Sequence, residues 1–114
     1  MEFTDEHHGD VVILRVEGRT SAEFPRLWKH IVALTREGHT QFVVDLSGCI
    51  WLNSQTMVWF TELNANLAPM GASFVVLDTE YGSGGWVEQL EPYAHVFGAL
   101  EDALEFLEDF RQED

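Results

Sequence analysis

The sequence predicts a single α/β domain, in which about four helices pack on a mainly parallel sheet of four to five strands. Two observations support this fold class. β-Branched apolar runs alternate with segments whose apolar residues recur at helical spacing, and 46% of the 114 residues are hydrophobic. A chain of this size can bury one core. We therefore expect one domain over residues 1–114, with its core between about residues 9 and 110.

Short runs rich in valine, isoleucine and phenylalanine predict the strands. Three of them stand at residues 11–16, 42–46 and 73–77. Residues 2–6 are expected to pair with the first run through a turn at Gly9 and Asp10, and residues 95–97 to form a short strand.

Helical periodicity predicts the segments between the strands. Helices are expected from about residue 23 to Gly38, from Asn53 to about Leu67, over residues 86–90 and over residues 99–111. Pro69 and Gly71 end the second of these helices, because neither residue continues a helix well. The last helix carries apolar residues on one face and acids on the other.

The charge balance is strongly acidic, with 6 Lys and Arg against 20 Asp and Glu and a formal net charge of −14. Such a surface repels nucleic-acid phosphates and anionic lipids, so we expect binding to neither, and a basic protein partner is favoured. The acidic N-terminus does not resemble a secretory signal, and no apolar run reaches the length of a membrane span. We therefore expect a cytoplasmic location without membrane insertion.

No catalytic or metal-binding motif is assembled in the sequence. Cys49 lies in an apolar stretch and is interpreted as a buried small hydrophobe, while His7 and His8 are expected in a mobile, solvated N-terminus. The glycine-rich loop at residues 82–85 lacks both the dinucleotide fingerprint and the P-loop Lys, so it predicts a plain turn. These observations favour a monomeric, non-enzymatic protein with no cofactor and no metal.

The start of the second helix is the strongest candidate site. Asn53 is a preferred N-cap residue, which places Ser54 in the first turn, where backbone N–H groups have no intrahelical partner. A phosphate on Ser54 would meet these donors and the positive end of the helix dipole. Without such a modification, Ser54 is simply a good residue for starting a helix.

The outward face of this helix is expected to carry almost no charge. At 100° per residue the core positions are Thr56, Trp59, Phe60, Leu63 and Leu67, and the opposite arc holds Ser54, Val58, Thr61 and Ala65, flanked by Met57 and Ala68. Only Glu62 approaches this arc. A nearly uncharged exposed stripe on a chain of net charge −14 suggests a docking face. The alternative is that another element of the chain covers it.

The segment that joins the second predicted strand to this helix resembles the STAS domain, the fold of bacterial anti-sigma factor antagonists. Asp45, Leu46 and Ser47 match the family's strand ending, and residues 53–57 take the place of its helix start, Asp-Ser-Ser-Gly-Leu. Here Asn53 replaces the aspartate and Thr56 the glycine. The resemblance covers roughly residues 9 to 110.

The resemblance implies that Ser54 is phosphorylated by a serine kinase that doubles as the anti-sigma factor, and that a phosphatase restores binding. The partner-binding residues would be Asn53, Ser54, Gln55, Met57, Val58, Thr61 and Ala65. The alternative within the family is a scaffold or transporter-associated subunit, including those of lipid-transport complexes, without a phosphoswitch. An enzyme or small-ligand carrier using the loop at residues 82–85 is the third and least favoured class.

Overall fold

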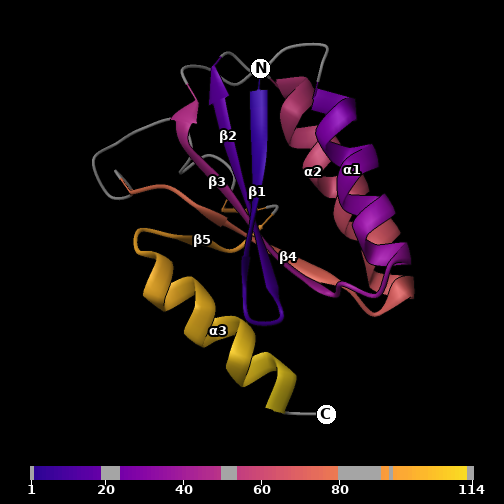
Figure 1. Cartoon of the computed structure of the whole chain (residues 1–114). Coiled ribbons are helices and arrows are strands. Elements are labelled where there is room, and N and C mark those ends of the chain that lie inside the picture. Colours follow the sequence, from indigo (N-terminus) through magenta and orange to yellow (C-terminus); the bar gives the residue numbers. More distant parts are fainter. Residues whose placement is uncertain (1, 19–23, 50–53, 80–90, 93, 113–114) are drawn as a thin grey trace.

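The computed structural model describes residues 2–18, 24–49, 54–79, 91–92 and 94–112 (Figure 1). The elements in chain order are β1 (Glu2–His8), β2 (Val11–Gly18), α1 (Phe24–Arg36), β3 (Gln41–Cys49), α2 (Ser54–Leu67), the 3-10 helix η1 (Ala68–Met70), β4 (Ser73–Leu77), β5 (Val96–Phe97) and α3 (Leu100–Gln112).

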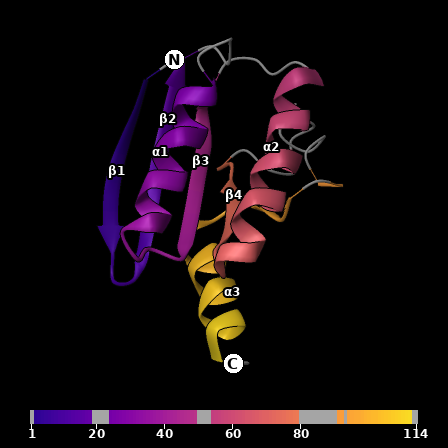
Figure 2. The ribbon, with the colours of Figure 1, turned by 90° about the vertical axis from the view of Figure 1, so that its right-hand side faces the viewer.

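The five strands form one mixed sheet in the order β1-β2-β3-β4-β5. β1 is antiparallel to β2, and the other three strand pairs are parallel. α1 and α2 lie side by side over one face of the sheet, and α3 covers part of the other (Figures 1 and 2). The predicted fold class, a mainly parallel sheet with helices on it, is thereby confirmed.

β3 lies at the centre of the sheet and is buried on both faces. Phe42, Val44 and Leu46 point into the core beneath α1 and α2, whereas Val43 points into the core beneath α3. A strand that is covered on both sides has a continuous apolar run rather than an alternating pattern, which explains why residues 42–44 are all apolar.

The helices on the two-helix face are anchored by apolar residues at helical spacing. In α2, Phe60, Leu63 and Leu67 are fully buried. Gly71 follows η1 with φ of 74° and donates its N–H to the Ala68 carbonyl, which ends the helical segment before β4. This conformation favours glycine because it has no Cβ to clash with the backbone.

Several element boundaries differ from the predictions. The N-terminal hairpin is confirmed, but His7 and His8 lie in β1 and not in a mobile tail, because all seven residues of β1 pair with β2. β3 continues past Leu46 to Cys49. The described residues contain three α-helices and one 3-10 helix; the helix expected at residues 86–90 and Asn53 lie outside them.

Among the described residues, no helix combines the length and the apolar composition that a membrane crossing requires.

The orientation of α2 can be tested with two glutamate substitutions. Leu63 is 1% exposed and Val58 is 47% exposed. Leu63→Glu buries a charge and is expected to lower stability by about 3 kcal/mol or more, whereas Val58→Glu should change it by less than about 0.5 kcal/mol. Thermal unfolding followed by circular dichroism measures both changes. Equal losses for the two variants would mean that α2 is rotated about its axis.

Candidate functional site

The candidate site lies at the edge of the sheet where the parallel strands end. β3 ends at Cys49, and α2 begins at Ser54, so the first turn of α2 holds Ser54 and Gln55 at that edge (Figure 1). The first turn of α2 contains no acidic residue. The free backbone N–H groups of this turn therefore have no negatively charged side chain from the same turn beside them.

One face of α2 is exposed and carries one charged residue, Glu62, beside an otherwise uncharged stripe. Val58, Thr61 and Ala65 are all exposed at spacings of three and four residues, while Phe60 and Leu63 on the opposite side are buried. Val58 and Met70 are the two large hydrophobic side chains that the described part of the chain exposes. The helix therefore presents to solvent the face that its sequence period predicts. The side chains of Ser54, Gln55, Thr56 and Met57 lie outside the described residues.

A bulge shapes the end of β3, directly before the chain leaves for α2. Arg15 pairs with Asp45, but Glu17 pairs with Gly48, so β3 holds one more residue than β2 across this step. A Cβ on Gly48 would lie 3.2 Å from the Val16 carbonyl oxygen, a spacing too tight for most side chains. Bulges bend a strand and increase its twist, and they are common beside functional sites.

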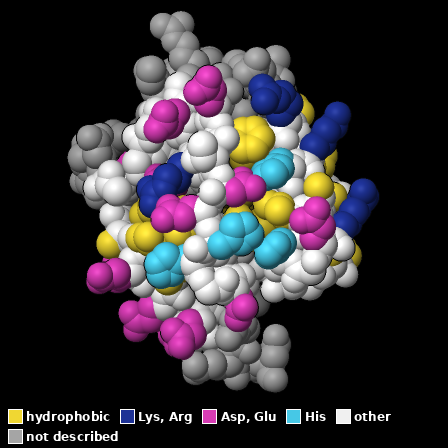
Figure 3. Space-filling model, in the orientation of Figure 1, with side chains coloured by type: hydrophobic (Ala, Val, Ile, Leu, Met, Phe, Trp, Pro, Cys, Tyr) yellow, Lys and Arg dark blue, Asp and Glu magenta, His cyan; other side chains and the backbone are white. Residues whose placement is uncertain are grey.

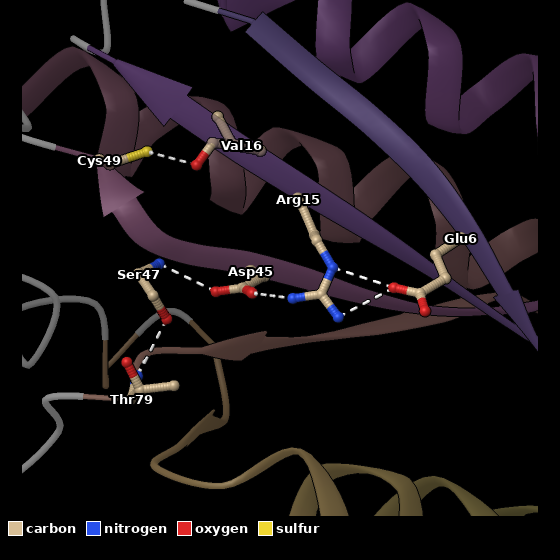
Figure 4. A network of polar contacts seen from close by, with 7 residues as sticks. All are labelled: Glu6, Arg15, Val16, Asp45, Ser47, Cys49 and Thr79. Carbon is tan, nitrogen blue, oxygen red and sulfur yellow. Dashed lines mark hydrogen bonds and ion pairs between the residues drawn. The ribbon is translucent and has the colours of Figure 1, made fainter.

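The Asp45 carboxylate holds this bulge in place (Figure 4). Asp45 is 7% exposed, and its Oδ1 accepts the Ser47 N–H at 2.9 Å, which satisfies a backbone donor that the irregular ladder leaves over. Its Oδ2 accepts a hydrogen bond from Arg15 Nη1 at 3.1 Å. Ser47 Oγ in turn accepts the Thr79 N–H at 3.0 Å, tying β3 to the end of β4.

Arg15 extends the same network to β1. Its Nε and Nη2 both lie 2.9 Å from Glu6 Oε2, so one guanidinium links β1, β2 and β3. The sequence identified Asp45 and Ser47 only as motif positions, and it did not predict their role in this network. A signal was present: Arg15 is a single base inside the apolar run of residues 11–16, and an opposite charge on a neighbouring strand stabilises such a position.

Cys49 is buried beside this network, as the sequence analysis expected. Its Sγ lies 3.7 Å from the Val16 carbonyl oxygen. Burial, and after it the negative charge of Asp45, raises the pKa of the Cys49 thiol from 9.0 to about 12. The thiol is therefore protonated at neutral pH and unsuited to nucleophilic chemistry.

The histidines of the two-helix face contact acidic or aromatic neighbours. His30 Nε2 lies 2.6 Å from Asp5 Oδ2, and the His7 ring lies against that of His39 with their centroids 5.2 Å apart. In the described part of the chain, no group of three or more His, Cys, Asp or Glu side chains is placed to hold a metal ion.

Comparison with solved structures identifies the fold family that this chain resembles. No protein-family model and no curated protein matches this sequence. Among solved structures, an anti-sigma factor antagonist from Mycobacterium paratuberculosis matches with a TM-score of 0.71 and 21% identity, over 91% of each chain. The unphosphorylated anti-sigma factor antagonist SpoIIAA matches with a TM-score of 0.70 and 13% identity, over 96% of this chain and 98% of that one. The chain has a STAS-like fold.

The STAS-like fold also occurs in larger proteins. The murine Slc26a9 anion transporter matches with a TM-score of 0.63 and 16% identity, over 91% of this chain but 18% of the transporter chain. At these identities the likeness shows the fold, and the function must be argued from the surface of this chain.

The raised pKa of Cys49 can be tested by thiol labelling. The difference between 9.0 and about 12 lowers the thiolate population about a thousandfold at pH 8. Iodoacetamide is therefore expected to alkylate the native protein at least about a hundredfold more slowly than the denatured chain. Because the folded state holds this proton more tightly, the thiol's contribution to stability is complete below pH 9 and is lost towards pH 12. Equal labelling rates would contradict the buried placement.

Proposed function

We propose that this protein is a non-enzymatic binding module, an anti-sigma factor antagonist of a partner-switching pathway that is controlled by phosphorylation of Ser54. The observation that carries the proposal is the exposed, uncharged stripe of Val58, Thr61 and Ala65 on a helix that begins at Ser54. The STAS-like fold supports it, because the solved structures that share this fold include anti-sigma factor antagonists.

The proposed switch acts through surface charge. A phosphate on Ser54 adds about −1.5 to −2 charges at neutral pH. At the start of α2 this charge is favourable for the helix by about 0.3–1 kcal/mol, because it meets free N–H groups and the positive end of the dipole. When a partner covers the uncharged docking stripe, the phosphate beside it must lose its water, and this desolvation is unfavourable. Binding is thus abolished without unfolding the helix.

The proposed partners follow from this scheme. A serine kinase that doubles as the anti-sigma factor binds the unphosphorylated protein, modifies Ser54 and releases it, and a phosphatase restores binding. SpoIIAA matches this chain in both states, the phosphorylated form with a TM-score of 0.63 and 15% identity over 93% of this chain and 99% of that one. We place the protein in the cytoplasm as a monomer, with Asn53, Gln55 and Met57 completing the docking surface around Ser54.

A second candidate function is a scaffold or transporter-associated subunit without a phosphoswitch, including subunits of lipid-transport complexes. The match to the murine anion transporter favours this candidate, because there a domain of the same fold forms a small part of a larger protein. In this case α2 docks a partner constantly. The two functions therefore differ in whether Ser54 is modified.

The proposal predicts phosphorylation at Ser54. Incubation with ATP and a soluble extract of the native host should add one phosphate to the purified protein, located at Ser54 by peptide mass spectrometry. Ser54→Ala should take up none, because the acceptor hydroxyl is missing. Ser73→Ala is the matched control, since Ser73 lies at the start of β4, and it should be phosphorylated like the wild type.

Two outcomes decide between the candidate functions. A protein phosphorylated at Ser54 whose Ser54→Asp variant no longer binds the kinase supports the switch. A protein that takes up no phosphate, yet loses its partner on Val58→Glu, is a constant docking module and contradicts the switch.

A further inference from the structure

We propose that the outward face of α1 is a docking surface for an acidic patch on a partner protein. The net charge of −14 is unevenly distributed over the fold. Among the Lys and Arg side chains that the structure describes, all but Arg15 lie on α1, at Arg26, Lys29 and Arg36. In Figure 3, drawn in the orientation of Figure 1, dark-blue side chains follow the right-hand edge, where α1 lies, and acidic ones gather mainly to the left and below.

The basic residues of α1 form one stripe. Arg26, Lys29, Ala33 and Arg36 are all exposed, and their spacings of three, four and three residues keep them within about one quarter of the helix circumference. α1 contains no Asp or Glu over its 13 residues. Among the described residues, neither Lys29 nor Arg36 takes part in an ion pair. We call Arg26, Lys29, Ala33 and Arg36 the α1 basic stripe.

Helix stability does not account for this arrangement. Arg36 in the last turn is favourable, because it faces the negative end of the helix dipole. Arg26 lies in the first turn, at the positive end of the dipole, where a cation is unfavourable for the helix, and its guanidinium carbon lies 5.9 Å from the centre of the Phe3 ring on β1. The helix dipole therefore does not account for an all-basic stripe on a chain with more than three acids for every base.

The dimensions of the stripe fit an acidic patch on a protein better than a continuous polyanion. From Arg26 to Arg36 it spans about 15 Å along the helix axis. It is bordered by acids, with Glu37 exposed directly after the helix and Asp5 beside His30 on the β1 side. A nucleic acid or an anionic membrane extends past such a short stripe onto these acids and is repelled there. A protein can place a few carboxylates on the stripe alone.

The stripe borders the proposed docking face without depending on it. α1 lies beside α2 (Figure 2). Each helix contributes a half-buried tryptophan, Trp28 or Trp59, to the shared core between the helices and the sheet. A partner seated on α2 can therefore reach α1. Because the stripe acts through permanent charges, its binding does not require the hydroxyl or the phosphate of Ser54.

The test measures binding of a poly-glutamate peptide by NMR at physiological ionic strength, where the overall repulsion is screened beyond about 8 Å. The peptide should shift backbone amide signals of α1 and leave those of α3 unchanged. The triple variant Arg26→Gln, Lys29→Gln, Arg36→Gln should bind about tenfold more weakly or worse, as expected for three exposed ion pairs.

The matched control carries the same net charge with α1 intact. Thr4→Glu, Asn64→Asp and Thr79→Glu add three negative charges at exposed positions outside α1. This control should lose far less affinity than the α1 variant, and Ser54→Asp should bind like the wild type. Equal losses in both triple variants overturn the proposal, as does tighter binding of duplex DNA or of phosphatidylserine vesicles. Failure of the peptide to bind α1 would not bear on the phosphorylation of Ser54, which is tested separately by mass spectrometry.

Discussion

The end of β3 depends on the hydrogen bonds that the Asp45 carboxylate accepts, and the start of α2 depends on the end of β3. The carboxylate satisfies the Ser47 N–H that the bulge leaves outside the ladder, and it pairs with the Arg15 guanidinium. A buried carboxylate without these partners would be strongly destabilising. Since Arg15 also binds Glu6, and Ser47 accepts the Thr79 N–H, one polar network joins four neighbouring segments of the sheet. The chain leaves for α2 from this rigid edge.

In the proposed scheme, the two-helix face divides binding between two kinds of surface. On α2, Val58, Thr61 and Ala65 provide an uncharged stripe whose association depends on excluding water. On α1, the basic stripe provides fixed positive charge on an otherwise acidic protein. Charge complementarity raises the rate of encounter and selects the partner, while the uncharged contact provides a surface that a single phosphate can disrupt. The opposite face, with acidic α3, opposes docking in the wrong orientation.

The sequence predicted the parts of this fold that depend on local periodicity. Val58 and Leu63 lie on opposite faces of α2 as expected, because the helical period determines which residues are exposed once the core side is known. The length of β3 and the Asp45 network were not predictable in the same way. Both depend on a register shift between β2 and β3, and register is set by pairing across the sheet. The positive face of α1 was missed because net charge averages over surfaces that the fold separates.

The central claim is that charge at Ser54 changes the docking surface while the fold stays the same. Comparison of the amide NMR spectra of the wild type and Ser54→Asp tests this claim directly. We expect shifts confined to the first turn of α2 and its immediate neighbours, with the β2, β3 and β4 signals unchanged, because the network around Asp45 holds the sheet edge in place. Shifts spread through these strands and α1 would contradict the account, since they would mean that the negative charge acts by rearranging the domain.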